Sequence, residues 1–395
     1  MLIGIVGKPN VGKSTFFKAA TLAEVLIANY PFATIKANHA VGYVKVDCAD
    51  KLFNVQCNPR HGFCLKHKRF VPVELMDVAG LVPGAHEGKG LGNQFLDDLR
   101  QADVLIHVVD ISGTTDSEGK LAKGHDPELD IKFLEEELDF WYLGILKKVW
   151  QTFARKMEVE HSDFAKTVAK QFSGLKVDEE IVKKAIKNLN VSLEKPSSWL
   201  DEELLKFSSE LRRLSKPIII AANKIDRPEA KENFERIKNN HKDVIIIPCS
   251  AESELALREA AKAGLIEYIP GEKDFEIITN IGDKQKLALQ FIQKNILDTY
   301  KTTGVQDCLN KSVFDFLKYI HVFPGGVNKL ADKDGNILPD CFLLPPNSTA
   351  LDFAYKIHQD LGDNFVKAID VKTKRAIGRE YLLNNGDIIE IVTKK

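Results

Sequence analysis

The sequence predicts an α/β fold with a mostly parallel sheet, an inserted helical domain and a small C-terminal domain of short strands. Three observations carry this prediction. An apolar strand, residues 2–6, leads directly into a glycine-rich loop and a helix. A second apolar run, residues 218–222, is followed by polar residues, as is typical of a buried parallel strand. Between these two strands, residues 119–211 repeat apolar side chains at helical spacing, which indicates additional helices.

The loop after the first strand has the pattern G-x-x-x-x-G-K-[ST]. Glycines at its two fixed positions let backbone N–H groups curl around phosphate oxygens, while Lys13 reaches the β- and γ-phosphates and the Ser14 hydroxyl ligates Mg²⁺. The helix that begins near Ser14 points its positive end at the bound anion. We therefore expect a nucleoside triphosphate to be held by Gly7, Asn10, Val11, Gly12, Lys13, Ser14 and Thr15.

A second motif predicts which base is bound. Asp226 closes an Asn-Lys-x-Asp sequence at the end of the second apolar strand. Its carboxylate can accept hydrogen bonds from guanine N1–H and from the N2 amino group, a donor pair that adenine lacks. We expect Asn223 to brace neighbouring loops or touch the base, the Lys224 stem to lie along the purine, and a backbone amide near Ala251, after Ser250, to approach guanine O6. A surface turn is the alternative interpretation, and the phosphate loop upstream disfavours it.

The metal and the γ-phosphate have their own candidate residues. An alternating strand delivers Asp77, which can hold Mg²⁺ through water, and the Gly80 N–H can contact the γ-phosphate. Thr34 lies in a loop after the first helix and is the natural hydroxyl to close over Mg²⁺, although an ordinary loop threonine is the alternative. The predicted metal-binding residues are Ser14, Thr34 and Asp77, and the predicted catalytic residues are Lys13, Thr34 and Gly80.

These residues carry a family resemblance. The chain resembles GTPases of the Obg superfamily, most closely the YchF/Ola1 subfamily in its archaeal form, through Pro9 and Asn10, the Tyr-Pro-Phe sequence at 30–32, and the glycine-rich run at 77–93. The resemblance implies a P-loop NTPase fold with a Ras-like G domain. It also implies that bacterial and eukaryotic members replace the final aspartate of the base-reading motif with glutamate and favour ATP. Because this chain keeps Asp226, we expect GTP and GDP as its ligands.

The residues around the γ-phosphate predict slow hydrolysis. Leu81 stands where many signalling GTPases have a glutamine that orients the attacking water, and leucine can neither donate nor accept a hydrogen bond. The resemblance implies that GTPases with asparagine at the Asn10 position often use a bound K⁺. A turn residue is an equally weighted interpretation of Asn10. His86 could be proposed as a base, but an exposed loop histidine without a catalytic role is favoured.

The motif spacing predicts the domain organisation. The predicted parts are a G domain at 1–118 and 212–272, a helical insertion at 119–211, a helical connector at 273–318 and a C-terminal domain at 319–395. The aromatic stripe of the insertion is interpreted as its own core. The C-terminal domain resembles a TGS domain, a ubiquitin-like β-grasp module shared with threonyl-tRNA synthetases and stringent-response enzymes, and this implies contact with RNA or the ribosome.

Composition places limits on partners and compartment. The formal net charge is −1 and the pI is about 6.8, so the chain lacks the usual basic footprint of a nucleic-acid-binding protein. The basic residues that could still gather on one face, or could be plain solvated surface, are Lys367, Lys372, Lys374, Arg375 and Arg379. No apolar run approaches the roughly 20 residues of a membrane span, and the chain opens on a strand instead of a signal sequence, so we expect a cytoplasmic protein. The oligomeric state is left open.

Six cysteines, unevenly spaced, fit reduced thiols better than a disulfide framework. Four potential zinc ligands, Cys57, His61, Cys64 and His67, fall within eleven positions. They lack a C-x₂-C knuckle, so a loop of free thiols and histidines is the favoured interpretation and zinc remains the alternative.

Two functional hypotheses follow. In the first, GTP hydrolysis to GDP drives a nucleotide-gated switch that binds ribosomes or RNA through the helical insertion and the TGS domain. In the second, the protein is a partner-independent GTPase or ATPase without ribosome binding. Leu81 favours the first hypothesis, because slow intrinsic hydrolysis suits a switch better than a turnover enzyme.

Overall fold

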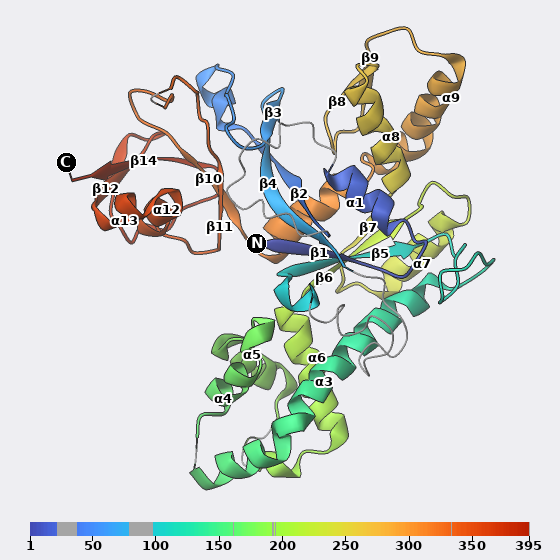
Figure 1. Ribbon diagram of the computed structural model, residues 1–395, viewed down its shortest axis with the longest axis vertical. Coiled ribbons are helices and arrows are strands. Elements are labelled where there is room, and N and C mark those ends of the chain that lie inside the picture. The colour runs from blue at the N-terminus through green and yellow to red at the C-terminus, as the bar shows by residue number, and fades with distance from the viewer. Residues whose placement is uncertain are drawn as a thin grey trace.

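The computed structural model describes residues 1–21, 38–78, 98–160, 162–191, 193, 195–332 and 334–394. Figure 1 shows a central sheet from which a long helical arm extends on one side and a small β-rich domain on another. Within the described residues, no helix is both long and apolar enough to cross a membrane. The predicted site residues Thr34 and Gly80, together with Leu81 and His86, lie outside the described residues.

The central sheet has the strand order β2-β4-β1-β5-β6-β7, and β3 pairs with β4. Its parallel strands are β1 (Leu2–Val6), β4 (Lys68–Asp77), β5 (Val104–Asp110), β6 (Ile218–Asn223) and β7 (Ile246–Pro248), and the antiparallel ones are β2 (His39–Asp47) and β3 (Phe63–Leu65). β1 and β5 are buried along their whole length, and accordingly β1 is a continuous apolar run and β5 is apolar except for His107 and Asp110. The carboxyl ends of the parallel strands meet at one edge, where ligands of such sheets bind.

Helices cover both faces of this sheet. Those of the G domain are α1 (Lys13–Thr21), α7 (Ala230–Asn240) and α8 (Ala251–Lys262). The helical arm contains α3 (Pro127–Glu160), α4 (Phe164–Gln171), α5 (Glu179–Leu189) and α6 (Asp201–Ser215), with short 3₁₀ turns at Ser173–Leu175 and Pro196–Ser198. At 1.5 Å per residue, α3 is about 50 Å long. It is the longest helix among the described residues.

The aromatic stripe of α3 forms the core of the arm, as predicted. Trp141 and Trp150 are buried in one cluster with Phe164 and Phe207 of α4 and α6. Trp150 lies 6.3 Å from Phe164 between ring centroids. Leu129, in the first turn of α3, is an exception and stays 55% exposed.

The segment after α8 corrects one prediction. The chain first forms a hairpin of β8 (Ile266–Tyr268) and β9 (Phe275–Ile277), although the sequence analysis assigned helix from residue 273. The reason is local. Apolar and polar side chains alternate along Phe275–Ile277 with the period of a strand, and this segment pairs with Ile266–Tyr268. The helical part follows as α9 (Asp283–Ile292), a π-helix (Gln293–Leu297), α10 (Asp298–Tyr300), α11 (Val305–Asn310) and a second π-helix (Lys311–Phe316).

The C-terminal domain is a five-stranded sheet with the order β11-β10-β14-β12-β13. Its elements are β10 (Ile320–Pro324), β11 (Phe342–Leu344), α12 (Ala350–Ile357), α13 (Gln359–Asp363), β12 (Phe365–Asp370), β13 (Arg375–Ile377) and β14 (Asp387–Thr393). Thr349 caps α12, because Thr349 Oγ1 accepts from the Asp352 N–H at 3.2 Å and Asp352 Oδ2 accepts from the Thr349 N–H at 2.8 Å.

Two buried histidines make stability depend on pH. His107 lies in β5 and His321 in β10, and both are almost fully buried. Burial lowers the pKa of His107 to about 3, with a further contribution from the Lys8 charge, and burial lowers the pKa of His321 to about 4. The native protein therefore keeps both rings neutral at a pH where the unfolded chain protonates them.

We expect the free energy of unfolding to fall as the pH decreases from 7 to 5, by about 2 kcal/mol for each histidine. The sign follows because stability is fully present above the unfolded pKa of about 6.5 and is lost as protons bind to the unfolded state below it. Urea unfolding of His321→Gln across this range should give a flatter pH profile. His358→Asn, which keeps the exposed N-cap of α13, is the control, and an equal flattening in both variants would contradict the assignment.

Candidate nucleotide-binding site

The phosphate loop connects β1 to α1 at the carboxyl edge of the sheet. Asn10 has φ 62° and Gly12 has φ 94°, so the loop uses left-handed backbone at both positions. A Cβ atom on Gly12 would lie 2.3 Å from Asn223 Nδ2, which leaves room only for glycine. The loop opens on a pocket of about 530 Å³, which is lined by Lys8, Pro9, Asn10, Gly12, Lys13, Ser14, Thr15, Asn223, Lys224, Asp226, Arg227 and Glu252.

Of the predicted phosphate and metal residues, the structure places Lys13 against Asp77 and Ser14 in the same pocket as Lys13, whereas Thr34 and Gly80 lie outside the described residues. Lys13 Nζ donates to Asp77 Oδ1 and to the Val78 carbonyl, each at 2.7 Å. Asp77 is paired with Ile5 in register, so the end of β4 lies beside the start of the loop. Ser14 lies in the first turn of α1 and lines the same pocket. A hydroxyl and a carboxylate beside a phosphate site are the oxygen ligands that suit Mg²⁺.

The side chain of Asn223 joins three segments of the site. Asn223 Nδ2 donates to the Val11 carbonyl at 2.8 Å, and Asn223 Oδ1 accepts from the Ala251 N–H at 3.0 Å. Of the two roles predicted for Asn223, these hydrogen bonds correspond to the bracing of neighbouring loops. The Ala251 amide is already paired here, so its predicted contact with guanine O6 stays a prediction that requires this hydrogen bond to be shared or exchanged.

Asp226 lies at the base end of the pocket with its carboxylate held by a neighbour. Ser250 Oγ donates to Asp226 Oδ1 at 2.8 Å, and Ser250 also caps α8. Each carboxylate oxygen carries two lone pairs, so Asp226 keeps acceptor capacity for two further donors. Two residues that were not predicted, Arg227 and Glu252, also line the pocket, and Arg227 Nε lies 3.8 Å from Asp226 Oδ2. No motif signal marks either residue.

Lys224 is fixed across the pocket by a buried acid. It has φ 63°, and its Nζ donates to Asp110 Oδ2 at 2.8 Å. Burial alone would raise the pKa of Asp110, but hydrogen bonds from Lys224 and the Ser112 hydroxyl outweigh it and hold this pKa below its usual value. Asp110 therefore stays ionised and restrains the lysine stem along the pocket wall.

The most informative contacts that the sequence did not predict join the phosphate loop to the helical arm. Lys8 Nζ lies 2.7 Å from Asp130 Oδ2 in the first turn of α3, and both side chains are buried. Asn10 Nδ2 donates to the Gly119 carbonyl at 2.9 Å. A Cβ atom on Gly119 would lie 2.5 Å from the Pro9 carbonyl oxygen, so the two loops are in close backbone contact. The left-handed turn at Asn10 agrees with its interpretation as a turn residue, and its role toward K⁺ stays a prediction.

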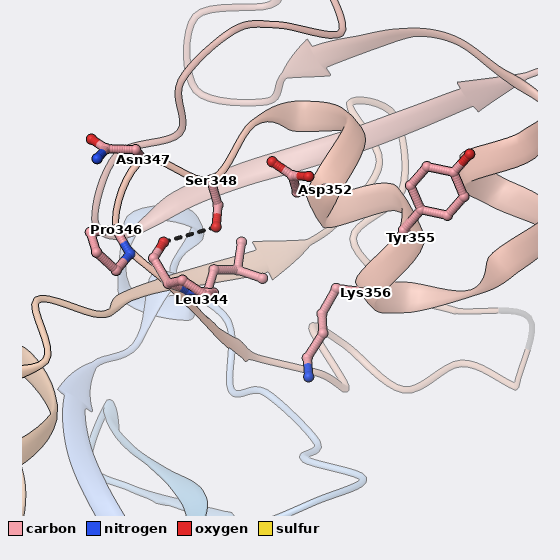
Figure 2. Close-up of a pocket in the computed structure, with 8 residues that line it drawn as sticks. Leu344, Pro346, Asn347, Ser348, Asp352, Tyr355 and Lys356 are labelled. Carbon is pink, nitrogen blue, oxygen red and sulfur yellow. Dashed lines mark hydrogen bonds between the residues drawn. The ribbon is translucent and has the colours of Figure 1, made fainter. Parts of the chain in front are cut away.

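A second pocket, of about 520 Å³, lies in the C-terminal domain. Figure 2 shows it between the loop after β11 and the first turns of α12, where the Ser348 hydroxyl donates to the Pro345 carbonyl at 2.8 Å. It contains no residue from the predicted nucleotide site. The residues that line it are Leu344, Pro345, Pro346, Asn347, Ser348, Asp352, Tyr355 and Lys356.

The parallel sheet, the phosphate loop and the base-reading motif together define a P-loop GTPase with a C-terminal β-grasp domain. Family models agree with each part. Residues 2–137 match the 50S ribosome-binding GTPase model, residues 221–326 match the G4 motif-containing domain of the Obg-like GTPase YGR210-like model, and residues 330–393 match the TGS domain.

Relatives cover the whole chain. A GTP-binding protein of Methanocaldococcus jannaschii is 50% identical over 99% of both chains, and the ribosome-binding ATPase YchF of Bacillus subtilis is 30% identical over 98% of this chain and 97% of its own. A crystal structure of a GTP binding protein from Pyrococcus horikoshii OT3 superposes with a TM-score of 0.78 at 41% identity, covering 100% of both chains. The chain belongs to the Obg-like GTPases of the YchF/Ola1 subfamily.

Base selection can be tested at Asp226. Asp226→Asn replaces an acceptor of two charge-assisted hydrogen bonds, worth about 1.5–3 kcal/mol each, so GDP affinity should fall by about 100-fold or more. Fluorescent GDP titration with ADP as competitor measures this. Glu259→Gln, an exposed carboxylate of α8 that pairs with Lys18 outside the pocket, is the control and should leave GDP affinity unchanged. Equal competition by ADP and GDP for the unmodified protein would show that the role of Asp226 is wrong.

Proposed function

We propose that this protein hydrolyses GTP to GDP with Mg²⁺ and uses its nucleotide state to control binding to the ribosome. In this proposal Ser14 and Asp77 hold the metal together with Thr34, and Lys13 and Gly80 contact the γ-phosphate. The preference for GTP is supported by Asp226, which the Ser250 hydroxyl holds at the base end of the pocket. Bound Mg²⁺ would supply positive charge to the phosphates. A carboxylate and a hydroxyl are oxygen ligands that suit this ion.

The observation that carries the switch is the direct connection between the phosphate loop and the helical arm. Lys8 and Asn10 belong to the loop that surrounds the phosphates, and their side chains contact Asp130 and Gly119. Asp130 lies in the first turn of α3, so a shift of the phosphate loop acts on one end of a helix about 50 Å long. In this proposal, α3 transmits a shift of the phosphate loop to the far end of the arm as a rigid rod.

The ribosome as partner is supported by two observations. The relative in Bacillus subtilis is named a ribosome-binding ATPase. In the C-terminal domain, the basic residues Lys372, Lys374, Arg375 and Arg379 are exposed on or directly after the hairpin of β12 and β13. An RNA backbone is a suitable ligand for such a surface, because its phosphates pair with lysine and arginine. A partner-independent nucleotide hydrolase is the alternative function.

The switch can be tested by sedimentation with ribosomes at physiological salt. The unmodified protein should co-sediment with a non-hydrolysable GTP analogue and remain in the supernatant with GDP or without nucleotide. Asp130→Asn keeps the side-chain shape but removes the charge that pairs with Lys8, so it should bind GTP normally and lose this nucleotide dependence. Asp126→Asn, an exposed carboxylate of the preceding loop that pairs with Arg236, is the matched control.

Absence of co-sedimentation in every nucleotide state would support the partner-independent hydrolase and contradict the switch. Nucleotide dependence that persists in Asp130→Asn would retain the ribosome as partner but exclude the Lys8 contact as the connection.

A role for K⁺ in hydrolysis is tested separately. Because leucine at position 81 cannot orient water, we propose that K⁺ near Asn10 supplies charge at the transition state, and single-turnover GTP hydrolysis should be at least tenfold faster in K⁺ than in Na⁺. Asn10→Ala should remove the difference between the two salts. Equal rates of the unmodified protein in both salts would assign Asn10 to the turn alone.

A further inference from the structure

Three cysteines and one aspartate converge in the segment between β2 and β4, and none of them lines the nucleotide pocket. Cys48, Asp50, Cys57 and Cys64 each place one ligand atom within 4.8 Å of the others. Cys48 precedes the 3₁₀ turn at Ala49–Phe53, which contains Asp50, and Cys64 lies in β3. Three of the four side chains are buried, and none of the thiols forms a disulfide.

The spacing of the ligand atoms is that of a small tetrahedral metal site. A tetrahedral zinc ion with Zn–S bonds of about 2.3 Å separates its sulfur ligands by about 3.8 Å, and a sulfur from a carboxylate oxygen by about 3.6 Å. In the structure, Cys48 Sγ and Cys57 Sγ are 3.5 Å apart, and Cys64 Sγ and Asp50 Oδ2 are 3.8 Å apart. Ordinary packing of free thiols does not require a fully buried carboxylate at the same point.

The groups around the cluster are those that support a metal site. His67 Nδ1 lies 2.9 Å from Asp50 Oδ1, so the imidazole orients the carboxylate. The Cys57 N–H donates to Asp50 Oδ2 at 3.0 Å. Arg69 is buried, and its Nη1 lies 3.6 Å from Cys57 Sγ, where its positive charge offsets part of the negative charge of three thiolates and a carboxylate.

We propose that Cys48, Cys57, Cys64 and Asp50 bind one Zn²⁺ ion in a closed structural site. Soft thiolate ligands in a tetrahedral arrangement select zinc over magnesium or calcium, and four protein ligands leave no open position for catalysis. These ligands differ from the zinc ligands that the sequence offered as an alternative, Cys57, His61, Cys64 and His67. Cys48 joins through the chain reversal between β2 and β4, His67 acts through Asp50, and His61 is outside the group.

The site also explains how the C-terminal domain is held. The Asn58 N–H donates to the Ile337 carbonyl at 2.9 Å, and the Arg60 N–H donates to the Pro339 carbonyl at 2.8 Å. Arg69 Nη2 donates to the same Pro339 carbonyl at 2.8 Å. Asn58 and Arg60 belong to the segment that the proposed ion would crosslink, and Arg69 in β4 contacts Cys57 of the cluster, so the metal fixes the surface on which residues 337–339 rest.

The proposal is tested by metal analysis of the full chain, purified without chelators or metal-affinity resin. Elemental analysis should find about one zinc per chain, and replacement by Co²⁺ should give the visible spectrum of a tetrahedral site with thiolate charge-transfer bands. Cys57→Ser should lower the zinc content to near zero. Cys308→Ala, which removes a buried thiol outside the cluster, is the matched control and should keep one zinc.

A second variant keeps the zinc proposal testable if the Cys57→Ser protein fails to fold. His67→Gln leaves every proposed ligand in place, and loss of such a supporting residue typically lowers metal affinity 10–100-fold. Zinc affinity is measured by competition with a chromogenic chelator, and GDP binding reports that the chain is folded. Unmodified protein that folds and binds GDP, but takes up neither Zn²⁺ nor Co²⁺ after incubation, would overturn the proposal.

Discussion

The Asn223 side chain is the interaction on which the nucleotide site depends. It lies at the end of β6, donates to the Val11 carbonyl 212 residues away in the sequence, and accepts from the Ala251 N–H. The amide side chain offers a donor and an acceptor in one rigid plane, whereas an aspartate carboxylate only accepts and could keep just one of these bonds. Gly12 packs against the same amide, and the sheet must bring β1 and β6 to a common edge before any of this geometry forms.

Strand β1 contributes side chains from its two faces to the cores of the two outer parts of the molecule. In β1, Leu2 and Val6 pack into the core of the helical arm, whereas Ile3 and Ile5 pack into a core that includes Phe323 of the C-terminal domain. This division follows from the period of two along a strand. The phosphate loop continues directly from β1, so it lies between the two cores. A single strand therefore connects the phosphate loop to the cores of both outer parts of the molecule.

How much the sequence could predict depends on the range of the contacts. The buried strands, the phosphate loop and the Asn-Lys-x-Asp motif are local patterns, and each forms where it was predicted. The contacts of Lys8 with Asp130 and of Asn10 with Gly119 join residues more than 100 positions apart, and no spacing rule marks them. The same reason applies to the zinc alternative, because proximity in sequence suggested His61 as a ligand, whereas the fold places Cys48 in the cluster.

The cysteine segment shows why a metal suits this position. Between β2 and β4 the chain has only a five-residue 3₁₀ turn and the three-residue strand β3, too little to build a hydrophobic core of its own. Yet this segment supports the C-terminal domain through Asn58 and Arg60, together with Arg69 of the adjoining β4. Arg69 contacts both Cys57 Sγ and the carbonyls of Leu338 and Pro339, so one buried cation belongs to the cluster and to the domain contact together. A crosslink at the cysteines would therefore stiffen the support where apolar packing cannot.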